Sequence, residues 1–252
     1  MAYLDGLLME GIYIGGRSIR TFGAKLRTDY TISGSSPSRT LRREPRTGSF
    51  SLLDTGWGLL TLKLPMDFYG ESRGEITWNM AGLRGLLQKE TEIDLGDGFL
   101  YRCVLTAAGS ESWTGEILCS QELTLQGIRH GQGRTVTGKS PLKLYNPGTY
   151  PRTDCTISIP GFRPKGTGPA VIALSAGGKT ILRWEIAPDA ALTGKTLLLD
   201  GVEKRSRYGA GALPGGAMTW REYPYLPPGE CSVAVTGAEM GEISVSYEPV
   251  FI

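Results

Sequence analysis

Hydrophobic and polar residues alternate along several short segments in the first half of the chain. Within residues 60–64, three leucines alternate with a threonine and a lysine, and residues 25–32 alternate in the same way. A period of two places one face of a strand against a core and the other toward water or a neighbouring subunit. The pattern therefore predicts a strand over each segment.

One segment, TWNMAGLRGLLQKE, has the period of a helix instead. Met80, Leu83 and Leu87 recur at helical spacing, and Lys89 lies where a cation complements the carboxyl end of the helix dipole. Two glycines weaken the pattern. We expect a short packing helix over about residues 79–90, followed by a pair of strands in FLYRCVLTA and EILCSQELTLQ.

The second half continues with short β-prone runs between Pro/Gly turns and has no comparable helical segment. The spacing of these runs is typical of a β-sandwich. The expected strands are Thr156–Ile159, Ala170–Leu174, Thr180–Glu185, Thr196–Leu199, Met218–Glu222, Cys231–Val235 and Ile243–Tyr247.

Composition supports a mainly β chain with two domains. The 252 residues include 36 glycines and 15 prolines, which fall between the β-prone runs. The composition changes near residues 130–148, and a chain of this length can bury two modest cores. We place the boundary after residue 135, which gives domains of residues 1–135 and 136–252.

Charge and the amino-terminal segment argue against several protein classes. Lys and Arg number 27 against 25 Asp and Glu, so the overall charge does not indicate a nucleic-acid-binding protein. The first residues, MAYLDGLLMEGIYIGG, carry an acidic residue where a signal peptide needs a basic one. No apolar run approaches the roughly 20 residues of a membrane helix. We expect a soluble protein made in the cytoplasm.

The cysteines Cys103, Cys119, Cys155 and Cys231 form no C-x-x-C pair. This disfavours a zinc ribbon or a thioredoxin-type redox site. We expect small, buried side chains that stay reduced. A cross-hairpin arrangement of Cys103 and Cys119 remains an alternative.

The stretch SGSSPSRTLRREPRTG is strongly polar and carries Arg39, Arg42, Arg43 and Arg46. Two prolines interrupt it, so we interpret it as a long loop rather than a buried element. Loops of this length within a compact domain are often functional. The arginines are candidates for docking onto an acidic partner or contacting a nucleic-acid backbone, and a solvated loop is the alternative.

The segment Gly133–Ser140 matches the phosphate-binding pattern G-x-x-x-x-G-K-[ST]. In such a loop Lys139 would reach the terminal phosphates and Ser140 would hold magnesium, so nucleotide binding is one alternative function. The pattern works at the start of a helix. Because Pro141 follows and a Pro-Gly pair soon breaks the chain, we favour a Gly-rich linker between two domains.

No catalytic constellation is evident in the sequence. The single histidine, His130, lies in the polar stretch GIRHGQGR and is interpreted as a solvated linker residue. The chain has neither a G-x-S-x-G elbow nor an H-E-x-x-H pair. Paired carboxylates for glycoside hydrolysis need only spatial proximity, and no pair stands out. We expect a protein without enzymatic activity, cofactor or bound metal.

Aromatic residues are frequent in the second half. Trp184, Tyr208, Trp220, Tyr223 and Tyr225 are candidates for a glycan- or partner-binding surface, because aromatic faces pack on pyranose rings. The same residue types are ordinary in the core of a sandwich. Carbohydrate binding is therefore a second alternative function.

The turns of the second half follow an order that resembles a known family. They are Asn146-Pro147-Gly148-Thr149-Tyr150-Pro151, Ile159-Pro160-Gly161, the strand Leu197–Asp200, Tyr225-Leu226-Pro227-Pro228-Gly229-Glu230 and Tyr247-Glu248-Pro249. Together they look like the distal tail protein (Dit) of long-tailed, non-contractile bacteriophages. Glu230 stands where that family commonly has Asn.

The first half resembles the same family less specifically. Arg43-Glu44-Pro45-Arg46-Thr47-Gly48 is similar to the family's P-G-R-x-G turn, although its first Gly is missing. The order of strands, one helix and a returning hairpin resembles the amino-terminal barrel of these proteins. The resemblance thus covers nearly the whole chain.

The resemblance implies an amino-terminal, tail-tube-like β-barrel with one packing helix, followed by a galectin-like or carbohydrate-binding-module-like β-sandwich. Distal tail proteins form a hexameric ring that joins the tail tube to the tail tip or baseplate. The implied partners are further copies of the chain, the tube protein, the tip or hub protein, the tape-measure protein and receptor-binding proteins. The genome would pass through the channel without specific binding. The implied location is the virion tail, with assembly in the host cytoplasm.

Ring closure would also cap exposed sheet edges with the next subunit. We therefore expect residues 25–53 and their arginines to make subunit or tube contacts.

Overall fold

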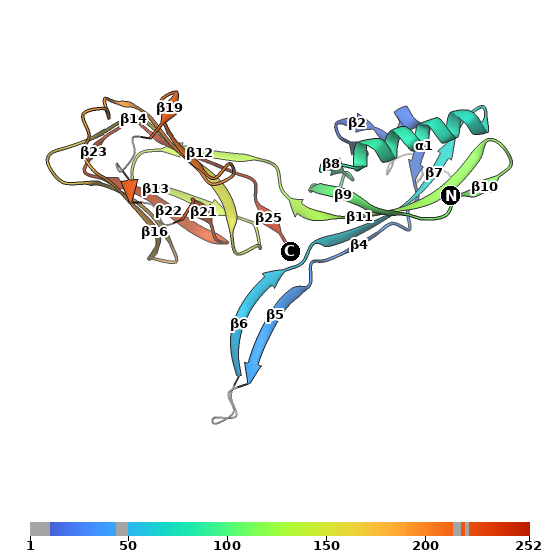
Figure 1. Ribbon diagram of the computed structural model, residues 1–252, viewed down its shortest axis with the longest axis horizontal. Helices are drawn as coiled ribbons and strands as arrows, with labels where there is room; N and C mark the ends of the chain where they lie inside the picture. The colour runs from blue at the N-terminus through green and yellow to red at the C-terminus, as the bar shows by residue number, and fades with distance from the viewer. Residues whose placement is uncertain (1–10, 44–49, 214–217, 220–221) are drawn as a thin grey trace. The chain divides into compact units, whose positions relative to one another are not determined.

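The computed structural model describes residues 11–43, 50–213, 218–219 and 222–252 (Figure 1). The chain divides into two compact units, Met1–His130 with Ile252, and Gly131–Phe251. Each unit has its own hydrophobic core. The sequence placed the boundary at residue 135, which lies inside a strand that pairs with β24 (Ile243–Tyr247) of the second unit.

The first unit is one curved antiparallel sheet with a helix. Its strands follow the order β2-β1-β8-β9-β11-β7-β3, with β10 on β11 and β4 on β7. The elements are β1 (Tyr13–Ile14), β2 (Arg17–Ser18), the 3-10 helix η1 (Ile19–Phe22), β3 (Ala24–Leu26), β4 (Thr31–Ser33), β7 (Leu60–Tyr69), β8 (Thr91–Asp94), β9 (Leu100–Ala108), β10 (Ser112–Thr114) and β11 (Leu118–His130).

The long strands β7 and β11 form the middle of this sheet. Burial alternates along both, as the leucine pattern predicted. Leu62 pairs with Leu125 and Leu64 with Leu123, so the register places four buried leucines on one face. A one-residue slip would turn them toward the opposite face, and the apolar pattern therefore fixes the register.

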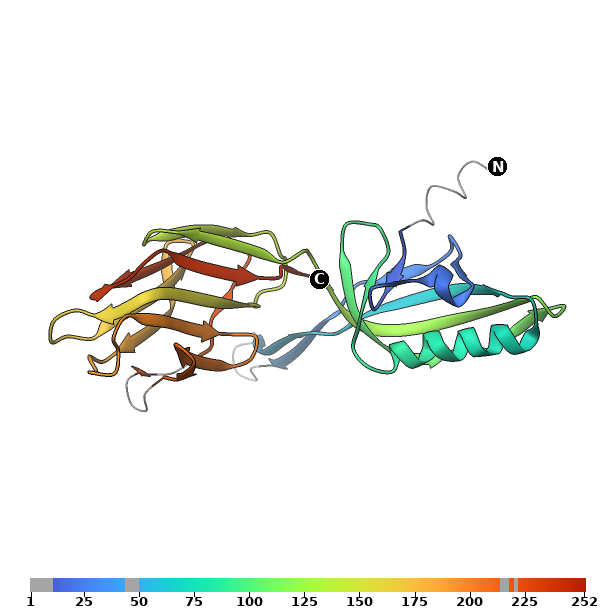
Figure 2. The same cartoon turned by 90° about the horizontal axis from the view of Figure 1, so that it is seen from above.

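The helix α1 (Arg73–Leu87) lies along one face of this sheet (Figure 2). Ile76, Met80, Leu83 and Leu87 are fully buried, which confirms the predicted packing helix. It begins earlier than expected because the side chain of Ser72 accepts a hydrogen bond from the Glu75 amide and caps the first turn.

Part of the polar stretch expected to be a loop is a strand of a hairpin instead. β5 (Pro37–Arg43) pairs with β6 (Phe50–Trp57) in antiparallel register. Within the described residues these two strands pair only with each other. The loop prediction was wrong because paired strands satisfy their backbone groups without needing an apolar face.

The second unit is a sandwich of two antiparallel sheets. One has the order β12-β24-β14-β17-β18-β19, with β21 and β23 on β14, and the other is β13-β22-β15-β16-β20. The strands are β12 (Arg134–Gly138), β13 (Leu142–Asn146), β14 (Thr153–Pro164), β15 (Ala170–Ala176), β16 (Lys179–Ile186), β17 (Lys195–Asp200), β18 (Arg205–Tyr208), β19 (Gly211–Ala212), β20 (Met218–Thr219), β21 (Tyr225–Leu226), β22 (Gly229–Thr236), β23 (Ala238–Glu239) and β24 (Ile243–Tyr247). The short strand β25 (Val250–Phe251) belongs to neither of these two sheets.

The sandwich core confirms the strand pattern of the second half. Alternate residues of β14, β15, β17, β22 and β24 are buried between the sheets. The β15–β16 hairpin turns at Gly177 and Gly178, whose φ angles of 54° and 76° suit a two-residue turn. The sequence missed β12, β13 and β18, and also the two-residue strands β19, β21, β23 and β25. The expected strand 218–222 begins as β20, and part of it lies outside the described residues.

All four cysteines are buried and free, as expected. Cys103 lies opposite Gly127 on β11, whereas Cys119 pairs with Trp113 and Phe68. The two therefore do not face each other across a hairpin. No helix among the described residues is long and apolar enough to cross a membrane.

Two glycine substitutions test this packing in opposite directions. A Cβ at Gly127 would overlap the Arg102 carbonyl oxygen and lie 2.6 Å from the Cys103 sulfur, so Gly127→Ala should lower the melting temperature. A Cβ at Gly85, in the helix, would meet nothing within 4 Å. Gly85→Ala should stabilise the chain by about 0.5–1 kcal/mol. Calorimetry of both variants checks the order, and a Gly127→Ala chain as stable as Gly85→Ala would contradict this register.

Candidate assembly sites

Among the residues that the structure describes, the strand β3 forms an open edge of the first unit's sheet. The Tyr69 amide donates to the Gly23 carbonyl (2.8 Å) and the Arg27 amide donates to the Pro65 carbonyl (2.9 Å). Because hydrogen-bonded pairs alternate along an antiparallel ladder, Ala24 and Leu26 direct their backbone N–H and C=O groups away from β7. This edge can therefore accept a further strand.

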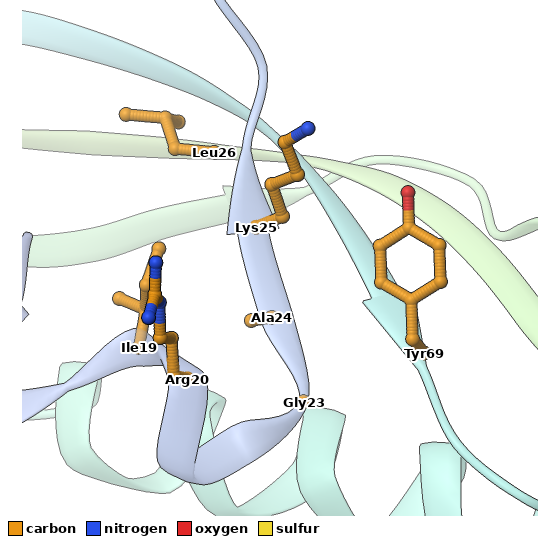
Figure 3. A pocket seen from close by; sticks show the side chains of 7 residues that line it. All are labelled: Ile19, Arg20, Gly23, Ala24, Lys25, Leu26 and Tyr69. Atoms are coloured by element: carbon orange, nitrogen blue, oxygen red, sulfur yellow. The ribbon is translucent and has the colours of Figure 1, made fainter. Parts of the chain in front are cut away.

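A hollow of about 350 Å³ lies beside this edge (Figure 3). Ile19 and Arg20 line it from η1, and Lys25 lines it from β3. Lys25 and Tyr69 extend toward the same side in Figure 3. The edge thus combines open backbone groups with two cations and an exposed aromatic ring.

A buried amide organises one end of the second unit. The Asn146 side chain is fully buried, and its nitrogen donates to the Leu226 carbonyl (3.1 Å), the Pro227 carbonyl (3.2 Å) and the Thr153 hydroxyl (3.2 Å). Its oxygen accepts from the Gly148 amide at 3.0 Å. Asn146 therefore joins the turn that follows β13 to the Pro-Pro-Gly turn before β22.

The end of β24 and the start of β25 contact the same end of the second unit. The Tyr247 hydroxyl donates to the Tyr145 carbonyl at 2.7 Å, and the Thr149 and Tyr150 amides donate to the Val250 carbonyl. A Cβ at Gly148 would lie 2.7 Å from that carbonyl, so the close approach requires glycine. Three of the turns on which the family resemblance rests thus form one hydrogen-bonded cluster.

The predicted arginines belong to the first unit. Arg39, Arg42 and Arg43 belong to strand β5. Arg46 lies outside the described residues. The chain thus carries these positions on a hairpin of the first unit rather than on a loop.

The aromatic set does not form one surface. Trp184 is 1% exposed and donates from its indole to the Glu222 carbonyl, and Tyr208 is buried with its hydroxyl donating to the Phe162 carbonyl. Neither ring can stack on a glycan, because both are used inside the core. Tyr223 is half-buried, and Trp220 lies outside the described residues. Alternation along β16 was the sequence signal that Trp184 faces inward.

The phosphate-loop pattern is a β-strand. The segment expected to be a linker contains β12, which pairs along its length with β24. The Ser140 hydroxyl accepts from the Val235 amide at 2.8 Å. No helix follows that could direct its amino end to a phosphate, so the geometry of a nucleotide site is absent from this described segment. The linker and nucleotide interpretations are both wrong here.

His130 is also placed differently from its prediction. It ends β11 and is 1% exposed rather than solvated, with its Nε2 3.7 Å from a Glu92 carboxylate oxygen. Within the described part of the chain, no group of three His, Cys, Asp or Glu residues is arranged to hold a metal.

Burial raises the pKa of the Cys103 thiol to about 12 and that of Cys231 to about 11, which keeps both in the unreactive protonated form.

Removing the Asn146 amide tests the turn cluster. Asn146→Ala removes a donor from the buried Leu226 carbonyl and from the part-buried Pro227 carbonyl, so it should destabilise the sandwich by roughly 2–4 kcal/mol. Lys143→Ala, an exposed change on the same strand, is the matched control and should stay within about 0.5 kcal/mol of the unchanged chain. Urea unfolding followed by circular dichroism measures both. Equal stability of the two variants would contradict the role given to Asn146.

Comparison with known proteins gives a structural match and no sequence match. No protein-family model matches the chain, and no curated protein does. The crystal structure of the SPP1 Dit (gp 19.1) protein, described as a paradigm of the hub adsorption apparatus in phages that infect Gram-positive bacteria, matches with a TM-score of 0.67. It is 14% identical over 96% of this chain and 98% of that chain. The phage P2 baseplate in its activated conformation matches with 11% identity over 92% of each chain and a TM-score of 0.49. The chain therefore has the fold of the SPP1 Dit protein over nearly its whole length.

Proposed function

We propose that this chain is a structural component of a phage tail, a distal tail protein located at the tail tip. The observation that carries the proposal is the match to SPP1 Dit, which includes both units in one chain order. The sequence resemblance, found in the turns of the second half, points the same way. The role is mechanical, so we propose no catalysis and no cofactor.

The proposed assembly is a closed hexameric ring between the tail tube and the tip or baseplate. The family resemblance supplies the number of subunits. The edge of β3 supports a head-to-tail contact, because open backbone groups can continue the sheet into the next copy. Closure of the ring would leave no free edge at these contacts.

Charge supports the same head-to-tail contact. The β3 side carries Arg20 and Lys25, with Asp67 opposite Lys25 on β7, whereas β8 and the turn after it, in the half of the sheet that ends with β1 and β2, carry Glu92, Asp94 and Asp97. Opposite charges at complementary surfaces steer association and fix the register. We propose that the basic edge of one copy meets the acidic end of the next.

The proposed partners beyond the ring are the tube, tape-measure and tip or hub proteins, with receptor-binding proteins attached to the second unit. Passage of the genome through the channel needs no specific contact. A chain with a net charge of only +2 suits that role, because a strongly basic channel would hold the phosphate backbone. Assembly would take place in the host cytoplasm.

The ring is tested on the full chain by light scattering and negative-stain microscopy. Six copies of 27.2 kDa give an expected mass of about 160 kDa and a ring with a central channel. The double variant Arg20→Glu, Lys25→Glu should shift the mass toward that of the single chain. The matched control reverses Lys179 and Arg207 to Glu in the second unit and should keep the ring. A single-chain mass for the unchanged protein would contradict the ring, and an intact ring in the first variant would contradict only this contact.

The hairpin arginines have a separate test. Arg42→Glu with Arg43→Glu reverses the charge of β5, and we expect weaker assembly of the ring or of its complex with the tube protein. Sedimentation of the chain alone and mixed with the tube protein measures both. Unchanged assembly in both mixtures would remove the hairpin from the contact surfaces.

A further inference from the structure

The outer face of the sheet β13-β22-β15-β16 carries a feature that the proposed ring does not use. Residues of these strands alternate between the core and this face. Lys143 lies opposite Ser232, and Ser232 lies opposite Ser175, so one row across three strands is polar. Tyr145 lies opposite Glu230 in the adjacent row. Figure 1 marks β13, β22 and β16 in this part of the sandwich.

These rows line a hollow of about 620 Å³. The volume falls within the range of roughly 300–1,000 Å³ that is usual for small-molecule sites. The β15–β16 turn borders it with Gly177 and Gly178, which have no side chains to fill it. Tyr145 borders it on β13 and is 59% exposed. An aromatic ring this exposed on a paired strand contributes little to the core.

The chemistry of the hollow combines one aromatic face with several hydrogen-bonding groups. The Tyr145 ring offers an apolar face, the exposed Glu230 carboxylate accepts hydrogen bonds, and the Ser175 and Ser232 hydroxyls both donate and accept. A pyranose ring presents the complementary pattern, an apolar C–H face surrounded by hydroxyl groups. We propose that this hollow binds an oligosaccharide of neutral pyranose units, with Tyr145 stacked on one ring and Glu230 fixing its hydroxyls.

Two other ligand classes fit less well. A nucleic acid or another polyanion would meet the Glu230 carboxylate beside Tyr145, with Lys143 as the one cation lining the hollow among its described residues. A protein partner would bring apolar anchor residues, and these need a deep apolar pocket rather than a floor of serines. A neutral saccharide satisfies the polar floor and covers the aromatic ring.

The site is tested by titrating the full chain with cellotetraose, maltotetraose and tetra-N-acetylchitotetraose, using calorimetry and saturation-transfer NMR. We expect at least one to bind with a dissociation constant near 1 mM or below. Tyr145→Ala should weaken that binding about tenfold or more, while Tyr145→Phe keeps the stacking face and retains most of it. Glu230→Gln should weaken it less than Tyr145→Ala.

The controls separate this site from folding and from the ring. Tyr145→Ala keeps the backbone carbonyl that Tyr247 binds, so its melting temperature and its assembly state should match the unchanged chain. Tyr13→Ala removes an exposed tyrosine of the first unit and should leave saccharide binding unchanged. No saturable binding of the three saccharides up to about 10 mM, or equal binding by Tyr145→Ala, would overturn the proposal. Neither result bears on the ring.

Discussion

Each backbone N–H and C=O group in a β protein needs a partner, and this requirement shapes both units of the chain. In the second unit the paired strands of two packed sheets meet it for one another, and the Asn146 amide supplies donors to the turn before β22. In the first unit one strand, β3, keeps alternate groups directed away from the sheet. At such an edge the requirement is met by water or by a further strand, so the curved sheet can be extended by another chain.

The requirement also explains how far the sequence predicts the fold. Where one face is apolar, as in β7 and β17, alternation identifies the strand, and the helix is identified by its buried row. The hairpin β5–β6 and the strand β12 lack that contrast and read as loop and linker. Only the pairing partner makes them strands, and the sequence does not reveal the partner. The cap formed by Ser72 was visible, since Glu75 follows three positions later.

The candidate sites were predicted less well for a related reason. Tryptophan and tyrosine are common in binding surfaces, which made Trp184 and Tyr208 candidates. Both are buried, because each lies on the face of its strand that packs against the core. Tyr145 was overlooked because it is a single aromatic in a short strand that the sequence did not identify. His130 was assigned to a linker because polar residues surround it, although the long ladder of β11 extends through it. A sequence shows which residues have the chemistry for binding or catalysis. Whether their side chains are exposed depends on the register of the strands that carry them.

The low identity to SPP1 Dit follows from the same physics. Backbone pairing is indifferent to the side chain, and a core accepts many apolar combinations of the right volume. The fold requires only that apolar and polar residues alternate along the strands, and that a few positions keep their residue. At those positions a side chain replaces a backbone hydrogen-bond partner, or only glycine fits. Asn146 and Gly148 are such positions, since one saturates its amide with backbone carbonyls and the other lies against the Val250 carbonyl. A fold held together in this way can retain its topology at 14% identity.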